Sequence, residues 1–148
     1  MSRFAAIDVG TNTILMLVAD VAEDGTFTVI TDRSEIARLG RGVDQTRSLS
    51  SAGMERALAV LRDFMRVCRQ SGVAEVAAVG TSALRDAVNA KTFTERLKRE
   101  LKLDLRVLSG AEEAAYSYLS VRKGLKIDAP EVLVVDVGGG STEFIWAR

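Results

Sequence analysis

The sequence carries one short pattern twice, once near its beginning and once near its end. Residues 6–13 (AIDVGTNT) and residues 134–142 (VVDVGGGST) each contain an apolar run, an Asp-Val-Gly step and then small or hydroxyl residues. A glycine-containing turn between two apolar runs predicts a hairpin in a buried sheet. We therefore expect two hairpins of one kind, in which Asp8 and Asp136 each end a buried strand.

Glycine turns of this kind can bind phosphate. Without a Cβ, backbone N–H groups can converge on a phosphate oxygen, and the hydroxyls of Thr11, Thr13 and Ser141 add donors. A buried Asp is costly unless it meets a cation or hydrogen-bond donors, so Asp8 and Asp136 are candidates to hold hydrated Mg²⁺. Ordinary turn chemistry explains either hairpin alone. It does not explain why the buried Asp is repeated, and this repetition favours a phosphate site.

Three strands should open the chain. Phe4 to Val9, Ile14 to Ala19 and Thr26 to Thr31 are runs of strand-forming residues separated by turn residues, and they predict consecutive antiparallel strands. The segment from Ser34 to Arg47 contains two glycines and shows no clear period. We expect a loop or an irregular strand extension there, and its role is open.

The middle of the chain alternates between helical and extended patterns. Apolar residues at helical spacing predict an amphipathic helix that begins at Ser50 or Ser51 and ends at Gly72. Val73 to Val79 is rich in Val and Ala, which predicts a strand buried on both faces. A second helix should run from about Asn89, a plausible cap, to Leu101, and a further strand from Leu103 to Leu108.

A capping box then marks the start of a third helix. Ser109 and Glu112 have the Ser-x-x-Glu spacing in which each side chain bonds a free backbone N–H of the first turn. We expect this helix to continue to Gly124. It should be followed by a short linker from Lys126 to Pro130 and then by the strands of the second hairpin, Glu131 to Val135 and Thr142 to Trp146.

Composition excludes several kinds of site. The 148 residues include no histidine, so a Ser-His-Asp scheme is impossible and acid–base chemistry falls to carboxylates, Tyr, Lys or the single Cys68. Because 20 Lys and Arg residues balance 20 Asp and Glu residues, no net field draws the chain to DNA, RNA or an anionic membrane. The sequence shows neither a signal-peptide pattern nor a membrane span, and we expect a cytoplasmic protein.

Four motifs occur in an order that is typical of one family. They are residues 8–13 (DVGTNT), 80–85 (GTSALR), 109–114 (SGAEEA) and 136–143 (DVGGGSTE). Together they resemble the exopolyphosphatase and guanosine pentaphosphate phosphohydrolase (Ppx/GppA) family of the actin-like ATPase superfamily. The resemblance spans almost the whole chain. It implies an α/β, ribonuclease-H-like fold with a mixed sheet, three antiparallel strands followed by parallel strands, and helices on both faces.

The resemblance also implies roles for individual residues. Glu113 matches the catalytic glutamate, the general base for the water that attacks the terminal phosphoryl group, and Arg85 matches a phosphate-binding arginine. Taken without the resemblance, Glu113 is also explained as a carboxylate favoured by the helix dipole, and Arg85 as a surface ion-pair partner. Asp136 and Glu143 match positions expected to bind Mg²⁺ directly or through water, and Asp8 is the third candidate Mg²⁺ ligand because of its place at the end of a buried strand. The other phosphate-binding positions are Gly10, Thr11, Asn12, Thr13, Gly139, Gly140 and Ser141.

The resemblance finally suggests how the chain is divided. Residues 1–125 should form the N-terminal domain and residues 126–148 the first hairpin of a second domain, so we expect this fragment to have little activity alone. The hairpin should pack on the first domain or on another copy, or be poorly ordered. Polyphosphate or guanosine pentaphosphate is the implied substrate, Mg²⁺ the implied cofactor, and the full-length protein an expected homodimer. A non-catalytic phosphate- or nucleotide-binding regulator and an ATP-dependent kinase or ATPase of the same superfamily are the alternatives.

Overall fold

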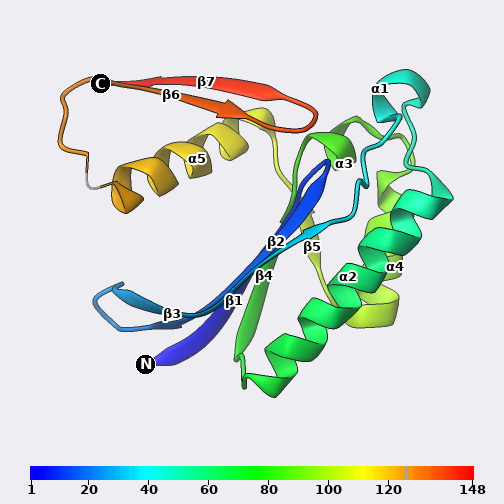
Figure 1. Cartoon of the computed structure of the whole chain (residues 1–148), viewed down its shortest axis with the longest axis horizontal. Helices are drawn as coiled ribbons and strands as arrows, with labels where there is room; N and C mark the ends of the chain where they lie inside the picture. Colours follow the sequence, from blue (N-terminus) through cyan, green and yellow to red (C-terminus); the bar gives the residue numbers. More distant parts are fainter. Residues whose placement is uncertain (126) are drawn as a thin grey trace.

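The computed structural model describes residues 1–125 and 127–148 and contains a five-stranded sheet and a separate two-stranded sheet (Figure 1). The strands are β1 (Ser2–Val9), β2 (Thr13–Val21), β3 (Phe27–Ile36), β4 (Glu75–Gly80), β5 (Leu105–Val107), β6 (Val132–Val137) and β7 (Thr142–Ala147). The helices are α1 (Val43–Thr46), α2 (Ser51–Gln70), α3 (Ser82–Asp86), α4 (Ala90–Leu101) and α5 (Gly110–Gly124).

Strand β1 lies at the centre of the larger sheet, whose order is β3-β2-β1-β4-β5. It pairs antiparallel with β2, and β2 pairs antiparallel with β3, whereas β4 and β5 continue the sheet in parallel. Parallel neighbours need long crossover connections, which run here through α2 and α4. This confirms the predicted mixed α/β sheet. It also places the end of β1 beside the end of β4, because Asp8 pairs with Val79 and Val9 with Gly80.

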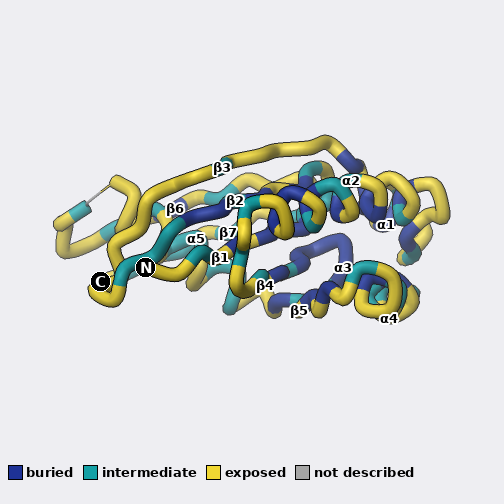
Figure 2. Tube along the Cα trace, turned by 90° about the horizontal axis from the view of Figure 1, so that it is seen from below, coloured by how far each residue is buried: buried dark blue, intermediate teal, exposed yellow. Residues whose placement is uncertain are grey.

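Helices α2 and α4 cover one face of this sheet, and the core lies between these helices and the sheet (Figures 1 and 2). Alternate residues of β1 and β2 point into the core because successive side chains of a strand face opposite sides. Ser50 caps α2 as expected, since its Oγ accepts a hydrogen bond from Gly53 N at 3.1 Å. The largest buried side chains of the core are Ile7, Ile14, Met16, Leu58, Leu61, Phe64, Phe93 and Leu97.

The opposite face of the sheet is only partly covered. Helix α5 lies on this side, so the expectation of helices on both faces is confirmed, but it reaches only one end of the sheet (Figure 1). Phe4, Leu15 and Ala77 remain exposed there. The prediction that β4 is buried on both faces is therefore wrong, since burial alternates along the strand. A run of Val and Ala does not reveal which neighbours will cover the second face.

Two short elements replace part of the predicted loop regions. Strand β3 extends through Ile36 because it pairs with β2 along its whole length, with a register shift between Val18 and Ala19. The remainder of the Ser34–Arg47 segment is an irregular connection and then α1. Thr81 follows β4 directly and precedes α3, a short helix that the sequence did not predict. Asn89 precedes α4 without capping it, because its side chain bonds the backbone N–H and C=O of Leu49 instead.

The second hairpin is a sheet of its own. Strands β6 and β7 pair antiparallel from Val132 and Ala147 to Val137 and Thr142, and they pack on α5 (Figure 1). The predicted linker begins at Lys126, which lies outside the described residues. Within residues 1–125 and 127–148, no helix has both the length and the apolar composition that a membrane span requires.

Candidate active site

The two glycine turns have the same backbone geometry. Gly10 N donates to Thr13 O at 3.0 Å, and Gly138 N donates to Ser141 O at 2.9 Å. Space is limited at both glycines: a Cβ on Gly10 would lie 2.9 Å from Thr13 O, which is too close, and one on Gly138 would make a tight contact of 3.2 Å with Ser141 O. The repeated sequence pattern therefore folds into one repeated backbone turn.

The two turns approach each other closely. A Cβ on Gly140 would lie 2.7 Å from Thr11 Oγ1, and one on Gly139 would lie 2.9 Å from Asn12 Nδ2. A side chain at either position would force Thr11, Asn12 or Ser82 to move, so the two glycines let the second turn pack closely against the first. Ser82, at the start of α3, joins them because its Oγ lies 2.9 Å from Thr11 Oγ1. Hydroxyl, amide and backbone donors from three separate segments thus meet at one place.

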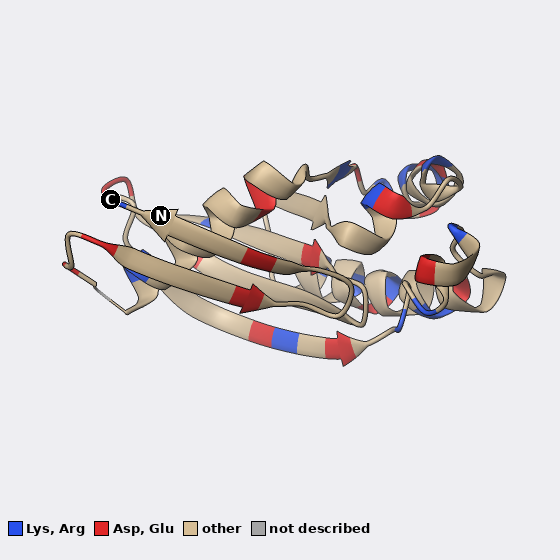
Figure 3. Ribbon diagram, turned by 90° about the horizontal axis from the view of Figure 1, so that it is seen from above, with Lys and Arg blue, Asp and Glu red and all other residues tan. Residues whose placement is uncertain are grey.

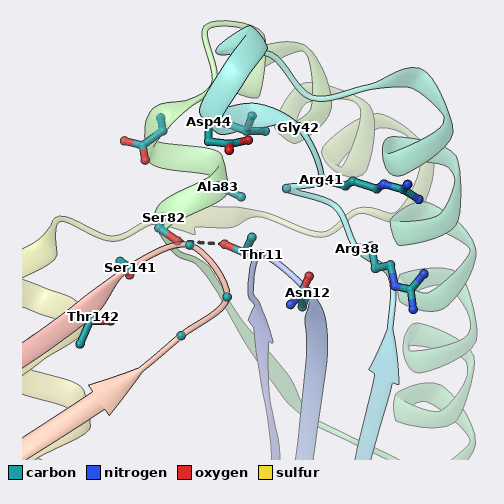
Figure 4. A pocket seen from close by; sticks show the side chains of 16 residues that line it. Thr11, Asn12, Arg38, Arg41, Gly42, Asp44, Ser82, Ala83, Ser141 and Thr142 are labelled. Carbon is teal, nitrogen blue, oxygen red and sulfur yellow. Dashed lines mark hydrogen bonds between the residues drawn. The ribbon is translucent and has the colours of Figure 1, made fainter.

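Two cavities surround this meeting point. The smaller, of about 460 Å³, lies between the turns and is lined by Asp8 and by residues of both hairpins. The larger, of about 870 Å³, opens on the side of Ser82 and α1 (Figure 4). The predicted phosphate-binding residues line one or both cavities, apart from Arg85. They are Gly10, Thr11, Asn12, Thr13, Gly139, Gly140 and Ser141.

Arg85 and Glu113 form an ion pair next to the turns. Arg85 Nη1 donates to Glu113 Oε2 at 2.9 Å and to the Leu108 carbonyl at 3.0 Å. The side chains are 29% and 15% exposed, so solvent screens the pair only in part. The capping box of α5 fixes the backbone next to Glu113, because Ser109 and Glu112 bond each other's backbone N–H groups. Glu112 is therefore engaged in capping, whereas Glu113 takes no part in the cap and pairs with Arg85.

Asp8 is the most unusual carboxylate of the chain. Its Oδ1 is buried and has no hydrogen-bond partner among the described residues. Burial raises the pKa of the Asp8 carboxyl above its ordinary value, and the nearby charges of Glu113 and Asp136 raise it further. Asp136 in turn accepts a hydrogen bond from Ser117 Oγ of α5 at 2.5 Å. Three carboxylates from β1, α5 and β6 thus influence one region.

This region fits a hydrated Mg²⁺ better than a closed metal site. Among residues 1–125 and 127–148, no three Asp, Glu or Cys side chains gather closely enough to enclose a metal ion. Mg²⁺, however, usually binds only one or two carboxylates and keeps waters and substrate phosphates as its other ligands. The orphaned oxygen of Asp8, with Asp136 nearby, meets that requirement. Glu143 is the cross-strand partner of Asp136, so both side chains lie on the same face of the hairpin.

Some contributors to the site were missed in the sequence. Ser82 lies within the Gly-Thr-Ser motif, so its hydroxyl was available as a signal, but its contact with Thr11 depends on the pairing of β1 with β4. Ser117 lies one helical turn after Glu113, and this spacing predicts that both face the same way. The segment around Arg38 and Arg41 lines the larger cavity, and no sequence period indicated it.

A family described as the Ppx/GppA phosphatase family matches residues 17–148. The chain belongs to the Ppx/GppA family. Its fold agrees with that assignment: the crystal structure of an exopolyphosphatase from Cytophaga hutchinsonii has a TM-score of 0.94 at 32% identity, and covers 99% of this chain and 47% of that one. An Aquifex aeolicus Ppx/GppA family member has a TM-score of 0.85 at 37% identity, covering 99% of this chain and 47% of that one.

Curated relatives carry two kinds of name. Exopolyphosphatase 1 of Mycobacterium tuberculosis is 32% identical over 95% of this chain and 41% of its own length. Guanosine-5'-triphosphate,3'-diphosphate pyrophosphatase of Vibrio atlanticus is 37% identical over 96% of this chain and 28% of its own length. The chain thus spans less than half of the length of these Ppx/GppA relatives.

Proposed function

We propose that this chain supplies the phosphate-binding turns and the general base of a Mg²⁺-dependent phosphohydrolase. The enzyme would release terminal orthophosphate from inorganic polyphosphate, guanosine pentaphosphate or both. Membership of the Ppx/GppA family supports the reaction class, and the names of the relatives in M. tuberculosis and V. atlanticus support these two substrates.

The observation that carries the proposal is the position of Glu113. It lines a cavity of about 710 Å³ together with Asp8 and Thr81, and these two residues also line the cavity between the glycine turns. A carboxylate is therefore adjacent to two turns whose donors suit phosphate. In a chain without histidine, it is also the available type of general base.

Arg85 would connect phosphate binding with the base. A guanidinium has five N–H donors, and the two bonds to Glu113 and Leu108 both come from Nη1. Its other nitrogens, Nε and Nη2, make no hydrogen bond within the described residues and can donate to a phosphoryl oxygen. Arg85 would thus hold the terminal phosphoryl group and Glu113 at a fixed separation, while Glu113 Oε1 accepts the proton of the attacking water.

Asp8 and Asp136, with Glu143, would hold the Mg²⁺. Bound there, the ion would neutralise phosphate charge and stabilise the charge that develops during phosphoryl transfer. Ser117 keeps the Asp136 carboxylate in place through its hydrogen bond. The proposal needs no histidine, cysteine or nucleophilic serine.

The decisive experiment compares two neighbouring glutamates. Glu113→Gln should lower orthophosphate release by about 10²- to 10⁴-fold, because an amide cannot accept the proton of water, while substrate binding is retained. Glu112→Gln is the matched control, since Gln also completes a capping box, and it should leave turnover nearly unchanged. Release should be measured with polyphosphate, guanosine pentaphosphate and ATP in parallel, with and without Mg²⁺.

The outcomes separate the possible functions. Unchanged turnover in Glu113→Gln would overturn the proposed role of Glu113. If the unaltered protein and both variants bind substrate without turning it over, the protein is a non-catalytic regulator. Turnover of ATP alone would indicate an ATPase or kinase.

We also propose that the 148-residue chain alone turns over slowly and that the active form is a cytoplasmic homodimer with a second domain that starts near residue 126. The lengths of the relatives support a second domain, and the buried free thiol of Cys68 suits a reducing compartment. Turnover by the 148-residue chain, compared with that of a longer relative, and the mass measured by light scattering test these points.

A further inference from the structure

One wall of the larger cavity is formed by residues that have no part in the proposed phosphate site. These are residues 37–42, which connect β3 to α1 and which the sequence left without a role. Their backbone is tied to the first glycine turn: the N–H groups of Ala37 and Arg38 donate to Asn12 O at 2.9 and 2.8 Å, and Gly40 N donates to Thr11 O at 2.9 Å. This segment is therefore attached directly to the proposed phosphate site.

The connection is held firmly in this position. A Cβ on Gly40 would lie 2.5 Å from Thr11 Cγ2 and 2.8 Å from Ala83 Cβ, so the backbone presses against both neighbours. Arg56 of α2 donates to the carbonyls of Ala37 at 2.9 Å and Arg38 at 3.4 Å. Arg38 has a φ of 51°, in the left-handed region that is unfavourable for residues with a Cβ. Strain of this kind persists only where surrounding contacts enforce it.

Arg38 and Arg41 are the cations of this wall. Both side chains are exposed, and within residues 1–125 and 127–148 neither forms an ion pair or donates a side-chain hydrogen bond. Figure 3 shows blue segments along this connection. In Figure 4 the two arginines lie on the side of the cavity away from Ser141, and their guanidinium groups point outward, away from the glycine turns. Their positions extend the row of donors outward from the glycine turns.

Two carboxylates also line the cavity. They belong to Asp44 of α1 and Asp86 of α3, and neither forms an ion pair within the described residues. Like charges repel, so a polyanion that leaves the glycine turns is directed toward the arginines and away from these carboxylates. The part of the cavity near the two arginines is therefore the more favourable place for an anion.

We propose that Arg38 and Arg41 form a distal anion subsite, which binds phosphate groups of the substrate beyond those held by the two glycine turns. The inference rests on the proposed function. The subsite would recognise the oxyanions of a phosphoanhydride chain and would favour long substrates over short ones. It assigns a role in substrate length selection to the connection between β3 and α1.

The test compares two ligands that differ only in length. Tripolyphosphate and long-chain polyphosphate are titrated calorimetrically into the 148-residue chain with Mg²⁺, at low and at physiological salt. The variants are Arg41→Gln and the double variant Arg38→Gln/Arg41→Gln. Arg69→Gln is the matched control, because Arg69 is also exposed and without an ion pair within the described residues but lies at the far end of α2.

The double variant should weaken the binding of long-chain polyphosphate by about tenfold at low salt, and that of tripolyphosphate by less than about twofold. Arg41→Gln should show an intermediate effect, and Arg69→Gln none. Equal loss for both ligands, or an equal loss in Arg69→Gln, would show general attraction of a polyanion and overturn the subsite. If the unaltered chain binds neither ligand, the proposed function itself fails. If binding occurs and no variant changes it, only the subsite fails.

Discussion

The two hairpins have nearly the same turn but very different surroundings. The β1–β2 hairpin lies in the middle of a five-stranded sheet, and its core-facing side chains are buried by α2 and α4. The β6–β7 hairpin forms a two-stranded sheet on α5, and Val134 is its one buried apolar residue within the described part of the chain. The equivalent residues Val9 and Val137 are 1% and 76% exposed.

This difference separates what a short sequence pattern determines from what it does not. The backbone hydrogen bond that closes the turn has almost the same length in both hairpins, because glycine and hydroxyl residues determine the turn locally. Burial depends instead on which elements pack against the strands. The exposed face of the second hairpin is strongly apolar and consists of Leu133, Val135, Val137, Phe144 and Trp146.

Truncation of the equivalent valines should show the contrast most strongly. Val9→Ala should lower the free energy of unfolding by about 2 kcal/mol, because it opens space in a packed core. Val137→Ala should change it by less than about 0.5 kcal/mol, since the side chain is already in solvent. Urea unfolding followed by circular dichroism measures both values. Equal losses would show that the second hairpin has a core of its own.

Neutralising the aspartate of each hairpin should also affect the two hairpins differently, with a smaller change in the free energy of unfolding. In Mg²⁺-free buffer at neutral pH, Asp8→Asn should raise the free energy of unfolding by about 1 kcal/mol, because it removes a buried charge whose Oδ1 has no partner among the described residues. Asp136→Asn should have little effect, since Asn can still accept the Ser117 hydrogen bond. The stabilised Asp8→Asn variant should nevertheless lose Mg²⁺-dependent turnover.

The pH dependence of this effect has a definite sign. The pKa of the Asp8 carboxyl is raised in the folded chain, so the folded state binds a proton more tightly than the unfolded state. Stability from this group is complete below the unfolded pKa of about 4 and is lost as the pH rises through the raised folded pKa. The advantage of Asp8→Asn should therefore be small at low pH and grow toward neutrality. An advantage that does not vary with pH would contradict the assigned burial.

Removal of the Ser117 hydroxyl should produce the smallest effect. Ser117→Ala deletes one hydrogen bond to a half-buried carboxylate and should cost about 1 kcal/mol or less. The loss should be confined to the second hairpin, where amide hydrogen exchange in β6 should accelerate while exchange in β1 stays unchanged. Ser120→Ala, on the same helix and without a side-chain hydrogen bond within the described residues, is the control. Faster exchange in both strands would show that the hairpins are not independent.

The sequence predicted the elements whose signals are local. The turns at Gly10 and Gly138 follow from glycine and hydroxyl chemistry, and the start of α5 follows from the capping box of Ser109 and Glu112. The order of the four motifs was enough to identify the family and the mixed sheet. The turns and the helix start depend on residues that are adjacent in the chain or one helical turn apart.

The features that were missed depend on distant contacts. The full length of β3 requires pairing with β2, and the position of Ser82 beside Thr11 requires β1 and β4 to lie in parallel. Asn89 has a good capping side chain, but Leu49 offers it two backbone partners that no local rule anticipates. The roles assigned to Glu113, Arg85 and the Mg²⁺ positions still depend on the proposed experiments.

Helix α5 is joined to the rest of the molecule at two points one helical turn apart. Glu113 accepts a hydrogen bond from Arg85 of α3, and Ser117 donates one to Asp136 of the second hairpin. Any rotation that separates the two glycine turns must therefore break one of these bonds or carry the whole helix with it. With the Ser117–Asp136 bond intact, a motion that separates the turns would draw Glu113 away from Arg85. In the proposed mechanism, one motion would then both open the phosphate site and reposition the proposed base.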